Sequence, residues 1–89
     1  MQEYFGIAAF RSRQQVLRFE AALKREGLPV RVISTPREVA LGCGLSVQFS
    51  MEDATAVIDA VNRLRPEHLI GVYRVEKGGG RSKLTVLRQ

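Results

Sequence analysis

The chain has 89 residues, of which 45% are hydrophobic and 26% charged, and this composition is typical of one small globular domain. No apolar run approaches the roughly 20 residues of a membrane span, and the N-terminus lacks signal-peptide features, so we expect a cytoplasmic protein without a membrane partner. One cysteine, Cys43, and one histidine, His68, exclude an intrachain disulfide and argue against a zinc site, so we expect no metal and no cofactor.

The net charge of +5 is unevenly placed along the chain. Residues 1–50 carry seven basic and four acidic groups, residues 51–73 carry two and four, and residues 74–89 carry five and one. A basic terminus of this kind can meet nucleic acid, phosphate or an acidic protein, although it is more often a solvated edge.

The first half of the chain alternates strands with one helix. Period-two patterning predicts a strand over 3–10, and Ser12 with Gln15 forms a capping box that begins a helix ending near Gly27. A short β-branched run over 30–34 and the alternation over 45–50 predict two further strands. The buried stripe of this helix consists of Val16, Phe19 and Leu23.

The second half repeats the pattern. Ser50 is placed to cap a second helix that ends before Pro66 and that has its own apolar stripe of Ala54, Val57, Ile58, Val61 and Leu64. A fourth strand is expected over 69–75. The three glycines within 77–83 predict a turn, followed by a short fifth strand over 84–87.

The order βαββαβ predicts an α+β fold, a ferredoxin-like two-layer sandwich with a C-terminal β extension. Residues 1–76 would form the domain, and 77–89 its glycine-rich turn and basic final strand or tail. The sheet face away from the helices is expected to be apolar, which predicts a homodimer or partner surface unless residues 84–89 fold back over it. This face would carry Tyr4, Phe10, Tyr73 and Val75 beside Ser46 and Gln48.

Cys43 stands between Gly42 and Gly44 in the stretch between the second and third strands. A lone cysteine is ordinarily buried, but the two glycines favour a presented thiol. Residues 35–38, Thr-Pro-Arg-Glu, predict the start of a short helix that Gly42 would end. A thiolate at this loop exit would be stabilised by backbone N–H groups or by Arg37, the nearest cation in sequence, while Glu38 would oppose it.

Pro36-Arg37-Glu38-Val39 followed by Cys43-Gly44-Leu45, after an amphipathic helix and a Val-rich strand, resembles the putative selenium/sulfur carrier-like family of small bacterial proteins. The resemblance covers about residues 4–75. It implies that Cys43 carries sulfur or selenium as a persulfide or selenosulfide. It also implies a cysteine desulfurase-type donor and an acceptor protein. From the loop itself, we expect Arg37, Glu38, Gly42 and Gly44 to be supporting residues of Cys43.

No Cys-His-Asn set, carboxylate pair or nucleotide fingerprint can be assembled, so we expect a carrier or binding protein rather than an enzyme. Three alternatives stay open: a metabolite-binding regulatory module, a thiol redox sensor that links Cys43 to its copy in a second subunit, and an RNA-binding module. The RNA reading is the least favoured, because residues 46–49 lack the aromatic pair that stacks bases. His68 is predicted to be a surface turn residue.

Overall fold

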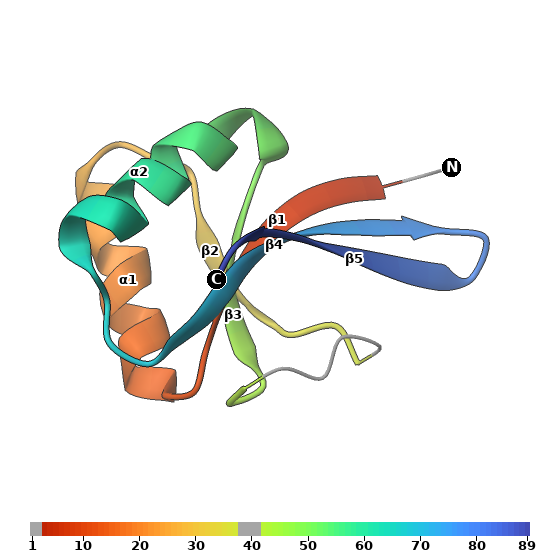
Figure 1. Cartoon of the computed structure of the whole chain (residues 1–89), viewed down its shortest axis with the longest axis horizontal. Helices are drawn as coiled ribbons and strands as arrows, with labels where there is room; N and C mark the ends of the chain where they lie inside the picture. Colours follow the sequence, from red (N-terminus) through yellow and green to blue (C-terminus); the bar gives the residue numbers. More distant parts are fainter. Residues whose placement is uncertain (1–2, 38–41) are drawn as a thin grey trace.

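The structure is a computed structural model that describes residues 3–37 and 42–89. Five strands form one sheet in the order β2-β3-β1-β4-β5, and all neighbouring strands are antiparallel. The elements in chain order are β1 (Glu3–Phe10), α1 (Arg13–Arg25), β2 (Arg31–Ser34), β3 (Leu45–Phe49), the 3-10 helix η1 (Met51–Asp53), α2 (Ala54–Leu64), β4 (Leu69–Gly78) and β5 (Arg81–Arg88) (Figure 1).

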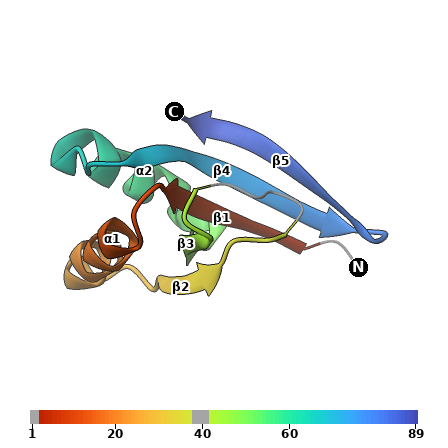
Figure 2. The same cartoon turned by 90° about the horizontal axis from the view of Figure 1, so that it is seen from below.

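Both helices pack against the same face of the sheet, which confirms the α+β class and is consistent with a ferredoxin-like fold (Figures 1 and 2). The helix-side core joins the predicted stripe of α1 to Val57, Ala60 and Val61 of α2. Ser12 caps α1 as predicted, because its Oγ accepts the Gln15 N–H at 3.4 Å. Ser50 was expected to cap α2 directly, but it precedes η1 and makes no side-chain cap bond.

The assignment of Tyr4 and Phe10 to the face away from the helices is wrong. Phe10 is fully buried in the helix-side core, where its ring centroid lies 5.5 Å from that of Phe19. The even-numbered residues of β1 therefore face the helices. Gly6 is one of them, and its missing side chain leaves the space that the Phe49 ring fills from the neighbouring strand. Both faces of β1 are apolar, so alternation alone could not distinguish them.

The opposite face of the sheet carries a second apolar cluster, and this cluster is buried within one chain. Its buried members are at most 7% exposed: Phe5, Ile7, Ala9, Tyr73 and Val75. The residues 84–89 do not fold back over this face, because β5 runs beside β4 as a fifth strand. The apolar face that suggested a homodimer is thus largely covered, and the dimer stays a prediction.

The β4–β5 hairpin has a shorter turn and longer strands than predicted, because the turn was expected over 77–83. β4 continues to Gly78, and β5 begins at Arg81 rather than at residue 84. Only Gly79 and Gly80 form the connection, with φ of 57° and 75°. Two successive positive φ angles are what the tightest hairpin turns need, so glycine at both positions matches the strand twist.

The contact between Gly6 and the Phe49 ring can be tested by adding a single methyl group. Gly6→Ala places a Cβ against ring carbons of Phe49, so we expect a loss of about 1–3 kcal/mol in the free energy of unfolding, measured in urea. The double variant Gly6→Ala/Phe49→Leu removes the ring and should lose less than the two single variants combined. Additive losses, or an unchanged stability in Gly6→Ala, would contradict this role for Gly6.

The two helices are joined by an ion pair whose pH dependence is predictable. Arg63 Nη2 of α2 lies 2.8 Å from Glu26 Oε1 at the end of α1, and this hydrogen bond lowers the pKa of Glu26. A lowered carboxyl pKa contributes stability above the unfolded pKa, and this contribution is lost as the pH falls through the folded pKa. Carbon-detected NMR titration should show the Glu26 pKa rising in Arg63→Met and staying unchanged in Arg18→Met, a change of an exposed cation elsewhere. An equal response to both variants would exclude this pairing.

Candidate functional site at Cys43

Cys43 lies at the end of the sheet where β1 finishes and β3 begins. Its backbone N–H donates to the Phe10 carbonyl oxygen at 2.9 Å. One residue later, the Gly44 carbonyl accepts the Thr35 N–H at 2.8 Å. The backbone on both sides of the Cys43 Cα is therefore hydrogen-bonded to neighbouring segments. One bond is to the last residue of β1, and the other is to the residue that follows β2.

The two flanking glycines have different roles. Both adopt positive φ, 67° at Gly42 and 89° at Gly44, a region that side-chain-bearing residues rarely enter. At Gly42 a Cβ would also collide with the Phe10 carbonyl oxygen and lie 2.7 Å from Ile70 Cδ1. At Gly44 a Cβ would meet nothing within 4 Å. Gly42 thus permits the close approach on which the Cys43–Phe10 bond depends, while Gly44 supplies only backbone conformation.

The Cys43 thiol is free and half-buried. The side chain packs against the helix-side core, and Sγ lies 3.7 Å from the Leu45 carbonyl oxygen, to which the thiol donates. Among residues 3–37 and 42–89, no charged group is hydrogen-bonded to this sulfur. The thiol is neither enclosed in the core nor fully presented.

The structure brings only part of the predicted site together. Gly42, Cys43 and Gly44 are adjacent and jointly fixed, whereas Arg37 is exposed and makes no described bond to the sulfur. Glu38 and the other residues of 38–41 lie outside the described residues. Most of the predicted short helix falls there as well. The described residues at its proposed start, 35–37, are not helical. The Thr35 hydroxyl, which was expected to cap the helix, hydrogen-bonds the Ser46 hydroxyl at 2.7 Å.

Sequence reasoning missed the groups that hold the loop, namely the Phe10 carbonyl, the Thr35–Ser46 hydroxyl pair and the Ile70 side chain. Ser46 is fully buried, so this hydroxyl contact fixes the loop start against the sheet. A backbone carbonyl leaves no mark in a sequence. The one available signal was Ser46 itself, a serine within a strand between two apolar residues, because a hydroxyl that becomes buried there needs a hydrogen-bond partner.

His68 lies in an exposed turn, as predicted, and its backbone carbonyl accepts the Arg11 N–H at 2.8 Å. This bond joins the start of β4 to the residue after Phe10, at the same end of the sheet as Cys43. The His68 side chain makes no described bond to the sulfur. Among the described residues, the contribution of His68 is therefore a backbone hydrogen bond that ties its turn to Arg11.

A cavity of about 510 Å³ lies at the opposite end of β1 and is lined by residues that include Tyr4, Phe5, Arg31 and Phe49, but not Cys43. Within the described residues, no three histidine, cysteine, aspartate or glutamate side chains are grouped as metal ligands. In the same residues, the helices are too short or too polar to cross a membrane.

A comparison with models of protein families matches residues 5–69 to the family described as "Putative Se/S carrier protein-like". The match covers most of the chain and includes Cys43, so the chain belongs to this family. It ends at Leu69, which leaves nearly all of β4 and the whole of β5 outside the matched region. Comparisons with curated proteins and with solved structures gave no match.

The unequal roles of Gly42 and Gly44 give a matched pair of variants. Both Gly42→Ala and Gly44→Ala place a side chain at positive φ, at a cost of about 1–2 kcal/mol each. Gly42→Ala should lose a further 1–3 kcal/mol or so, because the Phe10 carbonyl cannot move aside. It should also speed alkylation of folded Cys43 by iodoacetamide, followed by intact mass. Equal losses and equal alkylation rates in the two variants would disprove the anchoring role of Gly42.

Proposed function

We propose that this protein carries sulfur or selenium on Cys43, as a persulfide or selenosulfide, between a donor enzyme and an acceptor protein. The supporting observation is that the family match contains a single free thiol whose backbone is fixed on both sides. A donor of the cysteine desulfurase type supplies sulfur that is already activated. The carrier therefore needs no catalytic base of its own.

The loading step is a transfer of a sulfur atom without net oxidation. The Cys43 thiolate attacks the outer sulfur of a persulfide on the donor, so a new S–S bond forms at Sγ as the donor's S–S bond breaks. The electron pair of the broken bond leaves with the donor's cysteine, which is released as a thiol after it takes up a proton. Discharge to an acceptor thiolate repeats the same exchange. Selenium follows the same path with an Se atom in the outer position.

The surroundings of Cys43 suit this exchange in two respects. No second cysteine exists in the chain, so a persulfide on Cys43 cannot collapse into an intrachain disulfide. The backbone on both sides of Cys43 is fixed, and the hydrogen bond from its thiol to the Leu45 carbonyl is weak, so little hydrogen-bond energy opposes release of the sulfur to a partner.

The proposal is tested by loading the purified protein. Incubation with a cysteine desulfurase and free cysteine should raise the intact mass by that of one sulfur atom. Subsequent addition of dithiothreitol should remove the gain, because a thiol reductant releases the outer sulfur of a persulfide. Selenocysteine with a selenocysteine lyase should give the corresponding selenium adduct if the carrier accepts both elements.

Cys43→Ser keeps the shape of the side chain, removes the sulfur, and serves as the control that must show no gain. A folded protein that gains no sulfur from several donors, and whose thiol resists alkylation, would refute the carrier proposal. A disulfide-linked dimer that forms under mild oxidant, with no persulfide under any donor, would favour the redox-sensor alternative instead.

A further inference from the structure

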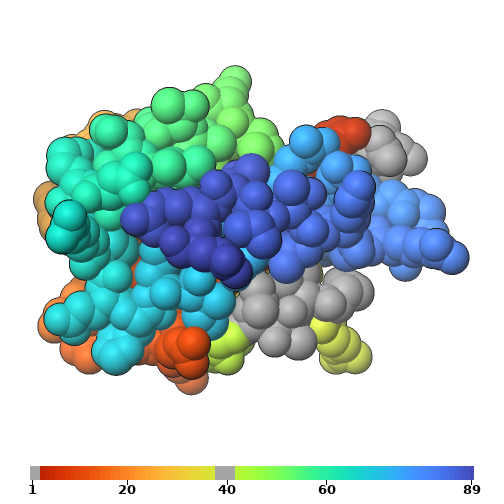
Figure 3. Space-filling view, viewed as in Figure 1, coloured from red at the N-terminus to blue at the C-terminus, as the bar shows by residue number. Residues whose placement is uncertain are grey.

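The two edges of the sheet are protected to very different degrees. At one edge, β2 has four residues, and its Val32 N–H donates to the Glu20 carboxylate of α1 at 3.0 Å. At the other edge, β5 has eight residues, and no described strand pairs with its outer side. β5 lies across the molecular surface, and its hairpin end projects beyond the rest of the sheet (Figures 2 and 3). A long open edge is a template for the addition of another strand.

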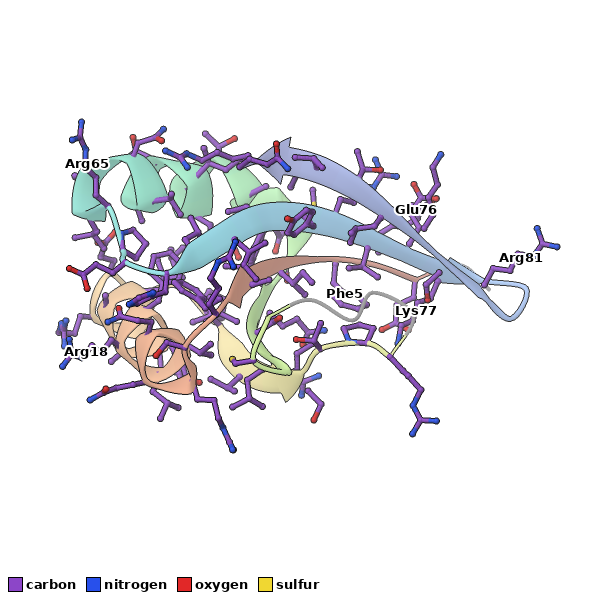
Figure 4. All side chains as sticks on the ribbon, turned by 60° about the horizontal axis from the view of Figure 1, so that its bottom comes forward. Phe5, Arg18, Arg65, Glu76, Lys77 and Arg81 are labelled. Carbon is purple, nitrogen blue, oxygen red and sulfur yellow. The ribbon has the colours of Figure 1, made fainter. Side chains whose placement is uncertain are left out.

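The side chains of β5 combine apolar and cationic positions. Leu84 and Val86 are 36% and 51% exposed, and their register partners Val75 and Tyr73 belong to the second apolar cluster. Arg81 lies at the projecting end of the hairpin and is exposed (Figure 4). Lys83 is exposed as well, and neither cation has an ion-pair partner among the described residues. The nearest acid, Glu76, lies opposite Lys83 but already bonds Arg74 at 2.8 Å.

We propose that the outer edge of β5 binds an extended acidic segment of a partner protein by strand addition. Backbone hydrogen bonds to the open edge would give affinity that is independent of sequence. Apolar side chains at alternate positions of the segment would extend the row that ends at Leu84 and Val86. Its carboxylates would meet Arg81 and Lys83, which supply the charge complementarity.

The charge of β5 argues against a second copy of this chain as the occupant. The strand contains Arg81, Lys83 and Arg88 and no acidic residue, so antiparallel self-pairing would bring six cations onto one ribbon. Like charges across paired strands are destabilising. The composition also argues against RNA, because β5 contains no aromatic side chain on which a base could stack.

This inference does not rest on the carrier proposal. No step involves Cys43, and β5 lies outside the region matched to the family. The Cys43→Ser variant should therefore bind the acidic segment as well as the native chain does. A failure of sulfur loading and a failure of segment binding are separate outcomes of separate experiments.

The test uses the full chain labelled with nitrogen-15 and two synthetic peptides, one alternating glutamate with valine and the other lysine with valine. The glutamate peptide should shift the amide signals of β5 and slow their hydrogen exchange, and the lysine peptide should do neither. Lys83→Glu should weaken binding about fivefold or more. The control Arg18→Glu makes the same change in net charge at an exposed site on α1 and should leave binding unchanged.

Four results would overturn the inference. The first is an absence of shifts in β5 with the glutamate peptide, and the second is equal binding of the lysine peptide. The third is an equal loss in Lys83→Glu and Arg18→Glu, which would show that only net charge matters. The fourth is that β5 signals respond to protein concentration alone, or to single-stranded RNA in place of the peptide, because a second copy or a nucleic acid would then be the occupant.

Discussion

The fit of the Phe49 ring over Gly6 is the contact on which the arrangement of the site depends. It places the even-numbered residues of β1 toward the helices, and Phe10 is thereby drawn into the helix-side core. Once the Phe10 side chain is buried against Phe19, its carbonyl is fixed at the end of the sheet. That carbonyl accepts the Cys43 N–H, so the position of the thiol is set by packing several residues away.

Cys43 is rigid in its backbone and loosely held at its sulfur. Two hydrogen bonds from neighbouring elements tie the backbone, and Gly42 is required for one of them by both conformation and space. The sulfur makes only a weak hydrogen bond to a carbonyl, and the residue is partly buried. A backbone that is fixed before a partner docks loses less conformational entropy on docking than a mobile one.

Features encoded by local patterns were predictable here. The stripe of α1, its Ser12 cap and the existence of β3 each depend on residues close in sequence, and the structure has all of them. The alternation in β3 does not give one buried face, because Ser46 is buried as completely as Val47. The orientation of β1 was not predictable, because both faces of that strand are apolar and the deciding contact, Phe49 over Gly6, joins distant residues. The predicted bounds of the β4–β5 turn were wrong because Gly78, a residue type typical of turns, is the last residue of β4. At the site, Cys43 and its glycines were identifiable, but their partner is a backbone carbonyl, which no residue type encodes.

The register of the sheet separates the Cys43 thiol from the hairpin end of β5, where Arg81 and Lys83 lie. Phe10, beside Cys43, pairs with Leu69 at the start of β4, whereas Glu3 pairs with Lys77, which in turn pairs with Ser82 of β5. β1 has eight residues, so seven residue steps of extended strand separate its two ends, a span on the order of 20 Å. Carboxylates bound at Arg81 and Lys83 would therefore lie far from the loop at Cys43. The other end of β5 lies closer to that loop, because Arg88 pairs with Val72, which pairs in turn with Ala8 of β1.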